Sequence, residues 1–567
     1  MNVPLNQPEP FKRAERRIEL ITPTEAKDRL VNFKDKNFRL HQEEAISWIM
    51  NGTKKFRIIR AKTGFGKSLC AMVCGLMAGD LTYLVSSKFL QGQITKDFPR
   101  IIESLWGRNN YPCLLDNSRN CNECFSTKLN PCEKKSLCLY KIAKTKALES
   151  SYRITNFAYF LSEISYAGRF SGNPFTVIDE ADSLQKSLDA FVSLSFGERS
   201  LFQLGLQEGP KYKTASAKNG IDSWKNFVQE ALVRSNQILG RLQREINAID
   251  NQETDFKLKK IKEMENFVHL SERCEIFLNN VDKGWVMQEI PRYGARQGRL
   301  IFSPTWINPE LANKFLWNHS GTFVLISATF LPIAVECKRL GIDIDDVEDG
   351  EIHEVESTFN PDNAPVHIWP AANLTRDTMA DGIPKLASAV KWILNKHKNQ
   401  RGLIHTVSFD LCNKVMAAVD SSRLITHTSE NRQEIINDYV DGFDKNDPGD
   451  VVLCSPSSER GLDLKYEMCS FIVILKMPWL SLADKIISAR ANSGTVGRLW
   501  YQAEAMATIE QMAGRGNRVE DDTVTIYILD EQVNKIYTSR PSLWSKSFQA
   551  QVAWDEAPWG YGGESKQ

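Results

Sequence analysis

The segment Ala61-Lys62-Thr63-Gly64-Phe65-Gly66-Lys67-Ser68 decides how this chain folds. It lies between an apolar run at 56–59, typical of a buried strand, and a periodic apolar stretch at 69–77, typical of a helix. A glycine loop between a strand and a helix lets backbone N–H groups surround phosphate oxygens at the positive end of the helix dipole. The segment therefore predicts a nucleoside triphosphate site, although Ala61 stands where the general pattern has glycine.

The residues of this loop have separate expected parts. Lys67 is expected to reach the β- and γ-phosphates, and the Ser68 hydroxyl is expected to ligate Mg²⁺. The candidate nucleotide-binding residues of the loop are Thr63, Gly64, Phe65, Gly66, Lys67 and Ser68.

A second motif follows the apolar run 175–178, which predicts a short buried strand that ends in Asp179-Glu180-Ala181-Asp182. Acidic residues at the carboxyl end of a strand lie where an α/β sheet binds its ligands. Asp179 is expected to hold Mg²⁺ through water, and Glu180 to orient and polarise the water that attacks the γ-phosphate. Alone this run would be an ordinary solvated turn; together with the phosphate loop it predicts a hydrolytic site.

Length and composition limit the class of protein. The 567 residues, 42% of them hydrophobic, exceed what one core can serve, so we expect about three or four domains. Because 71 basic and 70 acidic side chains balance to a net charge of +1, a polyanion would have to be held by a local groove. Residues 1–20 lack an apolar core, and no later run reaches the ~18 apolar residues of a membrane span. We therefore expect a cytoplasmic protein without membrane contact.

Three further segments occur in the order expected of a two-lobed motor that acts on nucleic acid. Gln42, in the run 38–42, precedes the phosphate loop at the distance where such motors place a glutamine that recognises adenine. The strand 83–86 leads into the polar run 87–93, which suits contact with a sugar-phosphate backbone. Ser327-Ala328-Thr329 follows the strand 323–326, and its hydroxyls could couple the hydrolytic site to the bound strand.

The second half of the chain predicts another parallel sheet. Helical and strand patterns alternate at 384–397, 402–406, 409–419, 424–428, 430–443 and 451–454. Just beyond the last strand lies Arg460-Gly461-Leu462-Asp463, from which we take Gly461 and Asp463 as candidate nucleotide contacts. Gln511 opens a run with Arg515 and Arg518 at the end of the helical stretch 499–513. A guanidinium on the γ-phosphate stabilises transition-state charge, so the second lobe is expected to supply the arginine finger.

Five of the 12 cysteines fall within 26 residues, at Cys113, Cys121, Cys124, Cys132 and Cys138. The surrounding segment has little apolar material, so a metal centre would have to order it. Four thiolates suit either [4Fe-4S] or Zn²⁺, and five free thiols are a further alternative. One cysteine is surplus; the resemblance described below would make it Cys121, Cys124 or Cys132, and the spacing alone does not decide.

Residues 183–299 show long helical periodicity. Apolar residues line one face of a stretch at 227–249 and of another at 258–268, with a polar break at 250–252. This pattern predicts an antiparallel helical hairpin. Its lysines could touch phosphates, but a charged helix face is more often solvated, and we favour that interpretation for Lys257, Lys259, Lys260 and Lys262.

Four segments resemble those of superfamily-two helicases of the XPD/DinG type. The segment 107–113 is similar to that family's GRxNYxC entry to an iron-sulfur insertion, and Cys138-Leu139-Tyr140, with 154–159 after it, is similar to the exit. Residues 355–360 resemble the segment that joins the lobes, and 403–409 resemble the LVHxxSY start of the second lobe. The chain departs from the family in having DEAD where DEAH is usual. Gln511 and the run 87–93 differ from RNA-directed DEAD-box enzymes, which favours DNA.

The resemblance implies an α/β fold of two RecA-like parallel-sheet lobes with a metal-cluster insertion and a helical arch in the first lobe. The first lobe would comprise 1–106, 141–182 and 300–365, and the second lobe 366–567. The cysteine-rich insertion would be 107–140 and the arch-like insertion 183–299. The family favours [4Fe-4S] over zinc, with Cys113 and Cys138 as the safest ligands.

The function implied is ATP-dependent translocation on single-stranded DNA, in the 5′ to 3′ sense, with unwinding of forked DNA. The catalytic residues would be Lys67, Asp179, Glu180, Arg515 and Arg518, with Mg²⁺ as cofactor. We expect a monomer of prokaryotic or phage type, acting in replication, recombination or repair. Two alternatives remain at this point, an RNA-directed helicase with a zinc-ordered insertion and an ATP-gated clamp that does not unwind processively.

Overall fold

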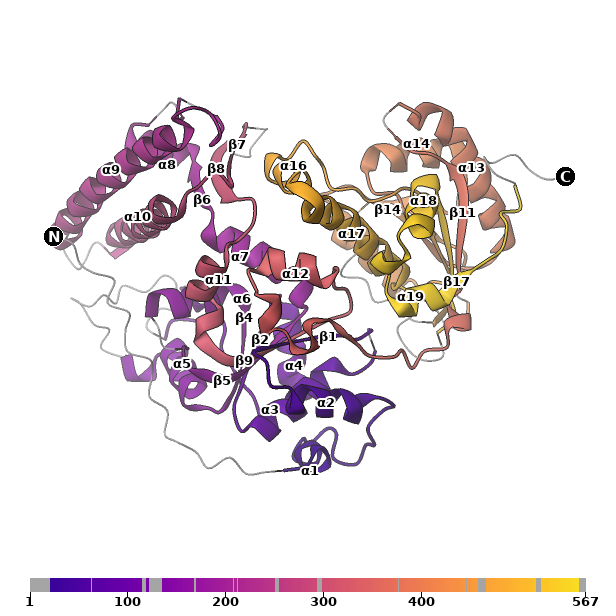
Figure 1. Ribbon diagram of the computed structural model, residues 1–567, viewed down its shortest axis with the longest axis horizontal. Coiled ribbons are helices and arrows are strands. Elements are labelled where there is room, and N and C mark those ends of the chain that lie inside the picture. The colour runs from indigo at the N-terminus through magenta and orange to yellow at the C-terminus, as the bar shows by residue number, and fades with distance from the viewer. Residues whose placement is uncertain are drawn as a thin grey trace.

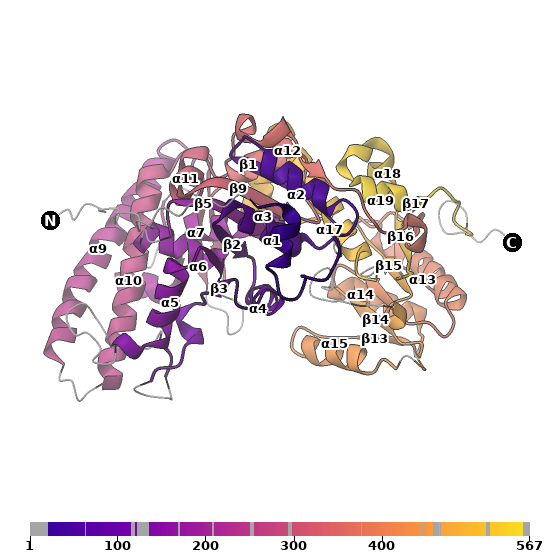
Figure 2. The ribbon, with the colours of Figure 1, turned by 90° about the horizontal axis from the view of Figure 1, so that it is seen from below.

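The computed structural model describes residues 21–62, 64–114, 119–121, 135–167, 170–206, 209–211, 213–249, 254–292, 298–375, 377–444, 446–447, 449–456, 464, 466–516 and 522–559. Two parallel sheets, each covered by helices, form two lobes that lie side by side (Figure 1). A helical hairpin projects from the first lobe on the side away from the second (Figure 2). Both predicted parallel sheets and the predicted hairpin are therefore present.

The first lobe contains a seven-stranded parallel sheet in the order β10-β1-β9-β5-β2-β4-β3. Its strands are β1 (Phe56–Arg60), β2 (Leu81–Val85), β3 (Glu103–Ser104), β4 (Tyr152–Asn156), β5 (Asn173–Asp179), β9 (Ser320–Ser327) and β10 (His353–Glu354). Alternate residues of β9 enter different cores, with Phe323 and Leu325 on one face and Val324 and Ile326 on the other. Burial on both faces explains why these strands are continuous apolar runs in the sequence.

Nine helices described in this lobe cover the sheet and its edges. They are α1 (Pro23–Asp28), α2 (Gln42–Asn51), α3 (Lys67–Ala78), α4 (Lys88–Asp97), α5 (Leu139–Glu149), α6 (Phe157–Ser162), α7 (Leu184–Val192), α11 (Pro309–Phe315) and α12 (Ile333–Leu340).

The insertion after α7, which we call the arch, runs from β6 (Leu194–Gly197) to β8 (Arg299–Pro304). Its hairpin consists of α9 (Gly220–Ala248) and α10 (Thr254–Asn280), preceded by the short α8 (Glu198–Leu204). The sequence did not predict its second component, an antiparallel sheet in which β8 pairs with both β6 and β7 (Trp285–Ile290). The strands are short, and β6 is separated from its partner β8 by the whole hairpin, so local periodicity carries little trace of the sheet.

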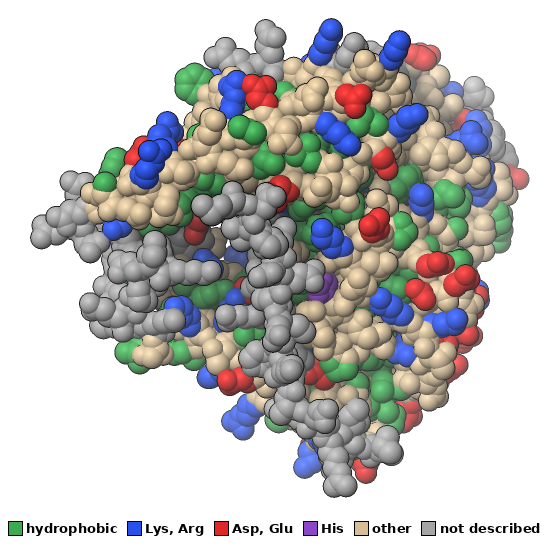
Figure 3. All heavy atoms as spheres, turned by 60° about the vertical axis from the view of Figure 1, so that its left-hand side comes forward, with side chains coloured by type: hydrophobic (Ala, Val, Ile, Leu, Met, Phe, Trp, Pro, Cys, Tyr) green, Lys and Arg blue, Asp and Glu red, His purple; other side chains and the backbone are tan. Residues whose placement is uncertain are grey.

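Of the four lysines for which we favoured a solvated role, Lys259 is exposed and the other three are partly exposed, so that interpretation stays a prediction. Lys260 pairs with Glu245 across the hairpin at 2.8 Å. On the face shown in Figure 3, Lys and Arg side chains are interspersed with Asp and Glu.

The second lobe repeats the architecture with the strand order β13-β14-β12-β15-β16-β11-β17, all parallel. Its strands are β11 (Val366–Ala372), β12 (Gly402–His405), β13 (Leu424–Thr426), β14 (Val452–Ser455), β15 (Phe471–Ile474), β16 (Thr525–Asp530) and β17 (Val552–Ala553). Its helices are α13 (Met379–Lys396), α14 (Phe409–Val419), α15 (Arg432–Asp441), α16 (Lys485–Ala491), α17 (Gly494–Ala513), α18 (Glu531–Ser539) and α19 (Lys546–Gln551). Helix α13 begins five residues before the predicted start at 384, because Pro384 lies inside the helix and does not open it.

The arch shares its core with one face of the first-lobe sheet. Phe302 of β8 is fully buried, with its ring centroid 5.3 Å from that of Trp224 and 5.0 Å from that of Phe277. These aromatic residues belong to the same apolar cluster as Ile58 and Phe323 of the lobe. The arch is therefore packed onto the first lobe and is not an independently folded appendage.

We expect Phe302→Ala to lower the free energy of unfolding of this region by about 3–5 kcal/mol, because it opens a cavity among packed aromatic rings. Thermal unfolding and limited proteolysis of the hairpin would measure the loss. The matched control is Phe202→Ala, since Phe202 on α8 is 74% exposed and should cost less than about 0.5 kcal/mol. Equal melting temperatures for the two variants would contradict the shared core.

Candidate active site

The phosphate loop has the geometry that its glycines predict. Gly64 and Gly66 have φ of 89° and 91°, in the left-handed region that favours glycine. Gly66 is the N-cap of α3, and a Cβ at this position would lie 2.4 Å from Nε2 of Gln42. Residue 66 is thus restricted to glycine by its backbone and by its neighbour. Thr63 lies outside the described residues.

Lys67 begins α3 and points back into the loop. Its Nζ donates hydrogen bonds to the carbonyl oxygens of Ala61 at 3.0 Å and Lys62 at 3.1 Å. The ammonium group thereby lies in the concavity where a phosphate would bind. Ser68 follows it in the first turn of α3, beside the open N-terminal amides.

Gln42 lies against this loop from the start of α2. Its Nε2 donates to the Phe65 carbonyl at 2.6 Å, and its Oε1 accepts from the Arg39 amide at 2.9 Å. The Arg39 guanidinium in turn donates to the Gly64 carbonyl. The predicted contact of Gln42 with adenine therefore remains a prediction, but the residue borders the loop that would hold the phosphates.

The acidic motif lies at the carboxyl end of β5. Asp179 is buried, accepts from the Tyr83 hydroxyl at 2.9 Å and accepts from the Glu180 amide at 2.9 Å. Burial raises the pKa of Asp179, and the nearby Lys67 charge and the Tyr83 hydroxyl oppose that rise. Glu180 has a left-handed backbone, with φ of 51°, and accepts a hydrogen bond from Ser86 at the end of β2. Tyr83 and Ser86 are supporting residues that motif reasoning did not identify.

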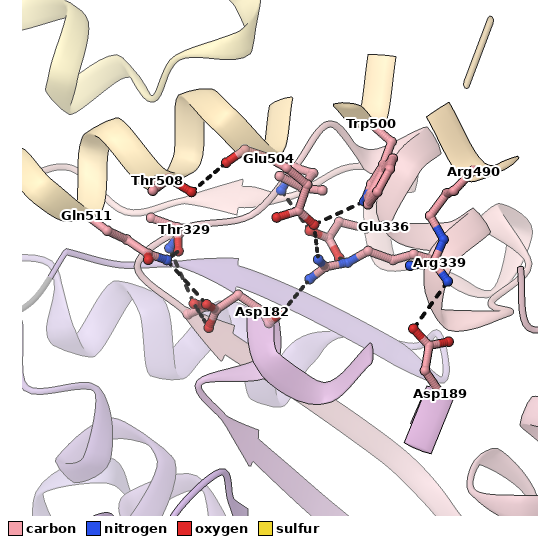
Figure 4. A network of polar contacts seen from close by, with 12 residues as sticks. Asp182, Asp189, Thr329, Glu336, Arg339, Arg490, Trp500, Glu504, Thr508 and Gln511 are labelled. Carbon is pink, nitrogen blue, oxygen red and sulfur yellow. Dashed lines mark hydrogen bonds and ion pairs between the residues drawn. The ribbon is translucent and has the colours of Figure 1, made fainter. Parts of the chain in front are cut away.

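Asp182 connects the acidic motif to both lobes. Its Oδ1 accepts from Ser327 Oγ at 2.8 Å, in the predicted Ser327-Ala328-Thr329 segment. Gln511, from the second lobe, donates its Nε2 to Thr329 Oγ1 at 2.9 Å and to Asp182 Oδ2 at 3.4 Å (Figure 4). Segments separated by more than 300 residues thus meet at one carboxylate.

Arg515 lies one turn beyond Gln511, just after the end of α17. Its Nε donates to the Gln511 carbonyl at 3.0 Å. Burial and the Arg515 charge lower the pKa of His405, at the end of β12, to about 3. The His405 imidazole is therefore neutral beside the guanidinium. The other predicted second-lobe contacts, Gly461, Asp463 and Arg518, lie outside the described residues.

The strand that leads into the phosphate loop is also joined to the second lobe. Arg60, the last residue of β1, pairs with Glu354 at 3.4 Å, and Glu354 accepts from the Lys546 amide of α19 at 2.8 Å. Burial lowers the pKa of Lys62 to about 8, while the charge of Glu510 on α17 acts in the opposite direction. The loop therefore borders the second lobe as well as its own sheet.

A buried arginine, which the sequence analysis missed, supports the acidic motif from α12. Arg339 is 2% exposed and pairs with Glu336 at 2.6 Å and with Glu504 of α17 at 3.4 Å. It also donates to the Asp182 carbonyl at 3.1 Å (Figure 4). Its signal was weak, because a Glu-Arg pair three residues apart on a helix resembles an ordinary solvated pair.

Three of the five clustered cysteines are described, namely Cys113, Cys121 and Cys138. They are partly exposed, whereas the other seven described cysteines are buried. A short antiparallel bridge joins the first two, since the Cys113 amide donates to Arg119 and the Cys121 amide donates to Tyr111. Cys138 is the N-cap of α5, so its side chain lies at the start of that helix.

Cys124 and Cys132 lie outside the described residues. Among the residues that the structure does describe, no set of three or more His, Cys, Asp or Glu side chains is arranged as a metal site. The thiols of Cys113, Cys121 and Cys138 are partly exposed and are chemically suited to bind a metal as thiolates. The bound metal remains a prediction.

Comparison with known proteins agrees with this architecture. Residues 391–548 match the helicase C-terminal domain family. The structure of S. tokodaii Xpd4 superposes with a TM-score of 0.53 at 14% identity, covering 91% of this chain and 99% of that one. A structure described as an XPD helicase gives a TM-score of 0.55 at 16% identity, covering 92% of this chain and all of the other.

No curated protein matches the chain by sequence. Within the ranges that the structure describes, no helix is both long enough and apolar enough to cross a bilayer. The matches nevertheless confirm the predicted resemblance to the XPD/DinG type. Residues 391–548 are thus similar to the helicase C-terminal domain family, and the chain as a whole has the two-lobed fold of the XPD helicases.

Proposed function

We propose that this protein is an ATP-dependent DNA helicase that moves along single-stranded DNA in the 5′ to 3′ sense and separates forked duplexes. The observation that carries the proposal is the contact of Gln511 with Thr329 and Asp182, which joins both lobes beside the phosphate loop. ATP hydrolysis at a site between two lobes changes the position of one lobe relative to the other, as translocation requires. The DNA preference and the polarity rest on the family resemblance.

The proposed chemistry assigns each group a task. Lys67 and the N-terminal amides of α3 would bind the phosphates of ATP, while Ser68, and Asp179 through water, would hold Mg²⁺, which would neutralise phosphate charge. Glu180 orients the attacking water. Arg515, with Arg518, stabilises charge on the transferred phosphoryl group from the second lobe. A passive clamp would not need this complete hydrolytic set.

Four of Cys113, Cys121, Cys124, Cys132 and Cys138 would hold an iron-sulfur cluster, which supplies order to a segment with few apolar residues. Tyr111 and Cys121 pack against the first-lobe core, so the ordered segment would have a fixed base. We propose that it acts as a wedge beside the separated strand.

We expect the purified protein to unwind a fork with a 5′ single-stranded tail and to leave a 3′-tailed fork intact. Strand separation on labelled forks, with ATP and Mg²⁺, reports activity and polarity together. Lys67→Ala should abolish unwinding and hydrolysis, because it removes the phosphate-binding ammonium, whereas the exposed Lys54→Ala should not. Unwinding by the Lys67 variant at the normal rate would refute the site.

Replacing Arg515 by Ala should lower kcat for DNA-stimulated ATP hydrolysis by about 10³-fold, as expected for loss of an arginine finger. KM for ATP should change much less, because the guanidinium acts mainly on transition-state charge. Steady-state kinetics would separate the two effects. The exposed Arg540→Ala is the control, and an unchanged kcat in the Arg515 variant would exclude the proposed role.

Cys113→Ser and Cys138→Ser should each remove most of the bound iron and abolish fork unwinding, while some DNA-stimulated hydrolysis remains. Iron and zinc analysis after anaerobic purification measures the first effect. Cys274→Ala, a change at a buried thiol of the arch, should leave the metal content unchanged. Zinc in the wild-type protein, with no iron, would favour the zinc-ordered alternative.

A further inference from the structure

A further contact between the lobes lies away from the nucleotide site, at Arg490 on α16. Arg490 is 6% exposed, and its Nε donates to the Thr305 carbonyl at 2.7 Å. Its Nη2 lies 3.2 Å from Oδ2 of Asp189 (Figure 4). The guanidinium also lies 5.0 Å from the ring centroid of Trp306 and 5.2 Å from that of Trp500.

The two polar partners of Arg490 flank the arch in the sequence. Asp189 is on α7, the helix that leads from the acidic motif into the arch, and Thr305 directly follows β8, the last strand of the arch. One side chain of the second lobe therefore holds both chain segments through which the arch is attached. Helix α16 also lies against β7 of the arch sheet.

The contact is partly buried, because the Arg490 side chain is 7% exposed and that of Asp189 25% exposed. Burial raises the pKa of Asp189, and the Arg490 charge opposes the rise. Leu331 and Val335 of the first lobe share a small apolar cluster with Ala491, Trp500 and Ala503 of the second. Trp306 donates its Nε1 to Ser493 at 2.8 Å, between α16 and α17.

The same pair of helices reaches the nucleotide site. Helix α17 has 20 residues, so it spans about 30 Å, with Gln511 and Arg515 at its far end. Glu504, midway, meets Arg339, which binds the Asp182 carbonyl. A movement of α17 at the nucleotide site would therefore move α16, and with it the segments that attach the arch.

We propose that Arg490 is a positioning residue. It makes the two segments that attach the arch, at Asp189 and Thr305, move with the second lobe during each ATP cycle. This inference rests on the proposed function, because it assigns the coupling between hydrolysis and strand separation to a specific contact. Arg490 does not touch the nucleotide site, so its loss should uncouple the two activities and not stop hydrolysis.

In the test, Arg490→Ala and Asp189→Asn are compared with wild type and with Arg498→Ala, an exposed arginine of α17. We expect ATP hydrolysis stimulated by single-stranded DNA to stay within about twofold of wild type, because Arg490 is not part of the nucleotide site. The number of base pairs separated per ATP should fall at least about tenfold. The double variant should be no worse than Arg490→Ala alone, because loss of Arg490 already removes its pairing with Asp189. Wild-type base pairs separated per ATP in Arg490→Ala would overturn the proposal.

Hydrogen exchange with and without a nonhydrolysable ATP analogue gives a readout independent of unwinding. In wild type, protection of 299–305 and of α16 should change together; in Arg490→Ala, only α16 should respond. Arg490→Lys keeps the positive charge but loses the contacts of the planar guanidinium group. It replaces the alanine variant in the test if that variant folds poorly. If the protection of 299–305 and that of α16 changed independently in wild type, the proposed coupling through Arg490 would be refuted. Absence of DNA-stimulated hydrolysis in wild type would instead refute the proposed function.

Discussion

The amide of Gln511, shared between Thr329 and Asp182, is the contact that joins the acidic motif of the first lobe to the second lobe. Asp182 also accepts from Ser327, so the carboxylate joins two strand ends of the first lobe to a helix of the second. A neutral amide is suited to this position, since it can exchange one acceptor for another without leaving a buried charge unpaired. The contact of Gln511 with the first lobe can therefore rearrange while the motifs on either side of it stay ordered.

A buried ion pair within α12 lies beside this contact and holds Arg339 in place. Arg339 and Glu336 are both almost fully buried, and burial raises the pKa of Glu336 while the Arg339 charge opposes the rise. Separating such a pair would leave an uncompensated buried charge, at a cost of about 3–5 kcal/mol. We infer that Arg339 stays with Glu336 and the Asp182 carbonyl, and that the partly exposed Glu504 is the partner that can leave.

The sequence predicted best what is local. The phosphate loop, the acidic run and α14 depend on neighbouring residues, and α14 occupies the predicted 409–419. The antiparallel sheet of the arch was missed, because its pairing joins 194–197 and 285–290 through 299–304. Tyr83 was predicted only as part of a strand; its contact with Asp179 arises because β2 and β5 are neighbours in the sheet. Arg339 and Arg490 were missed because burial of a charge is a property of the fold and leaves no periodic signal.

The arch has two attachments of different physical character. Its aromatic core is continuous with the first lobe through residues such as Phe302, whereas its polar root is held by Arg490 of the second lobe. A close-packed aromatic core resists deformation, because small displacements lose many dispersion contacts at once. A few directional hydrogen bonds, in contrast, allow rotation about the contact. Relative motion of the lobes is therefore expected to be taken up at α7 and at the residues after β8, between the rigid core and the Arg490 joint.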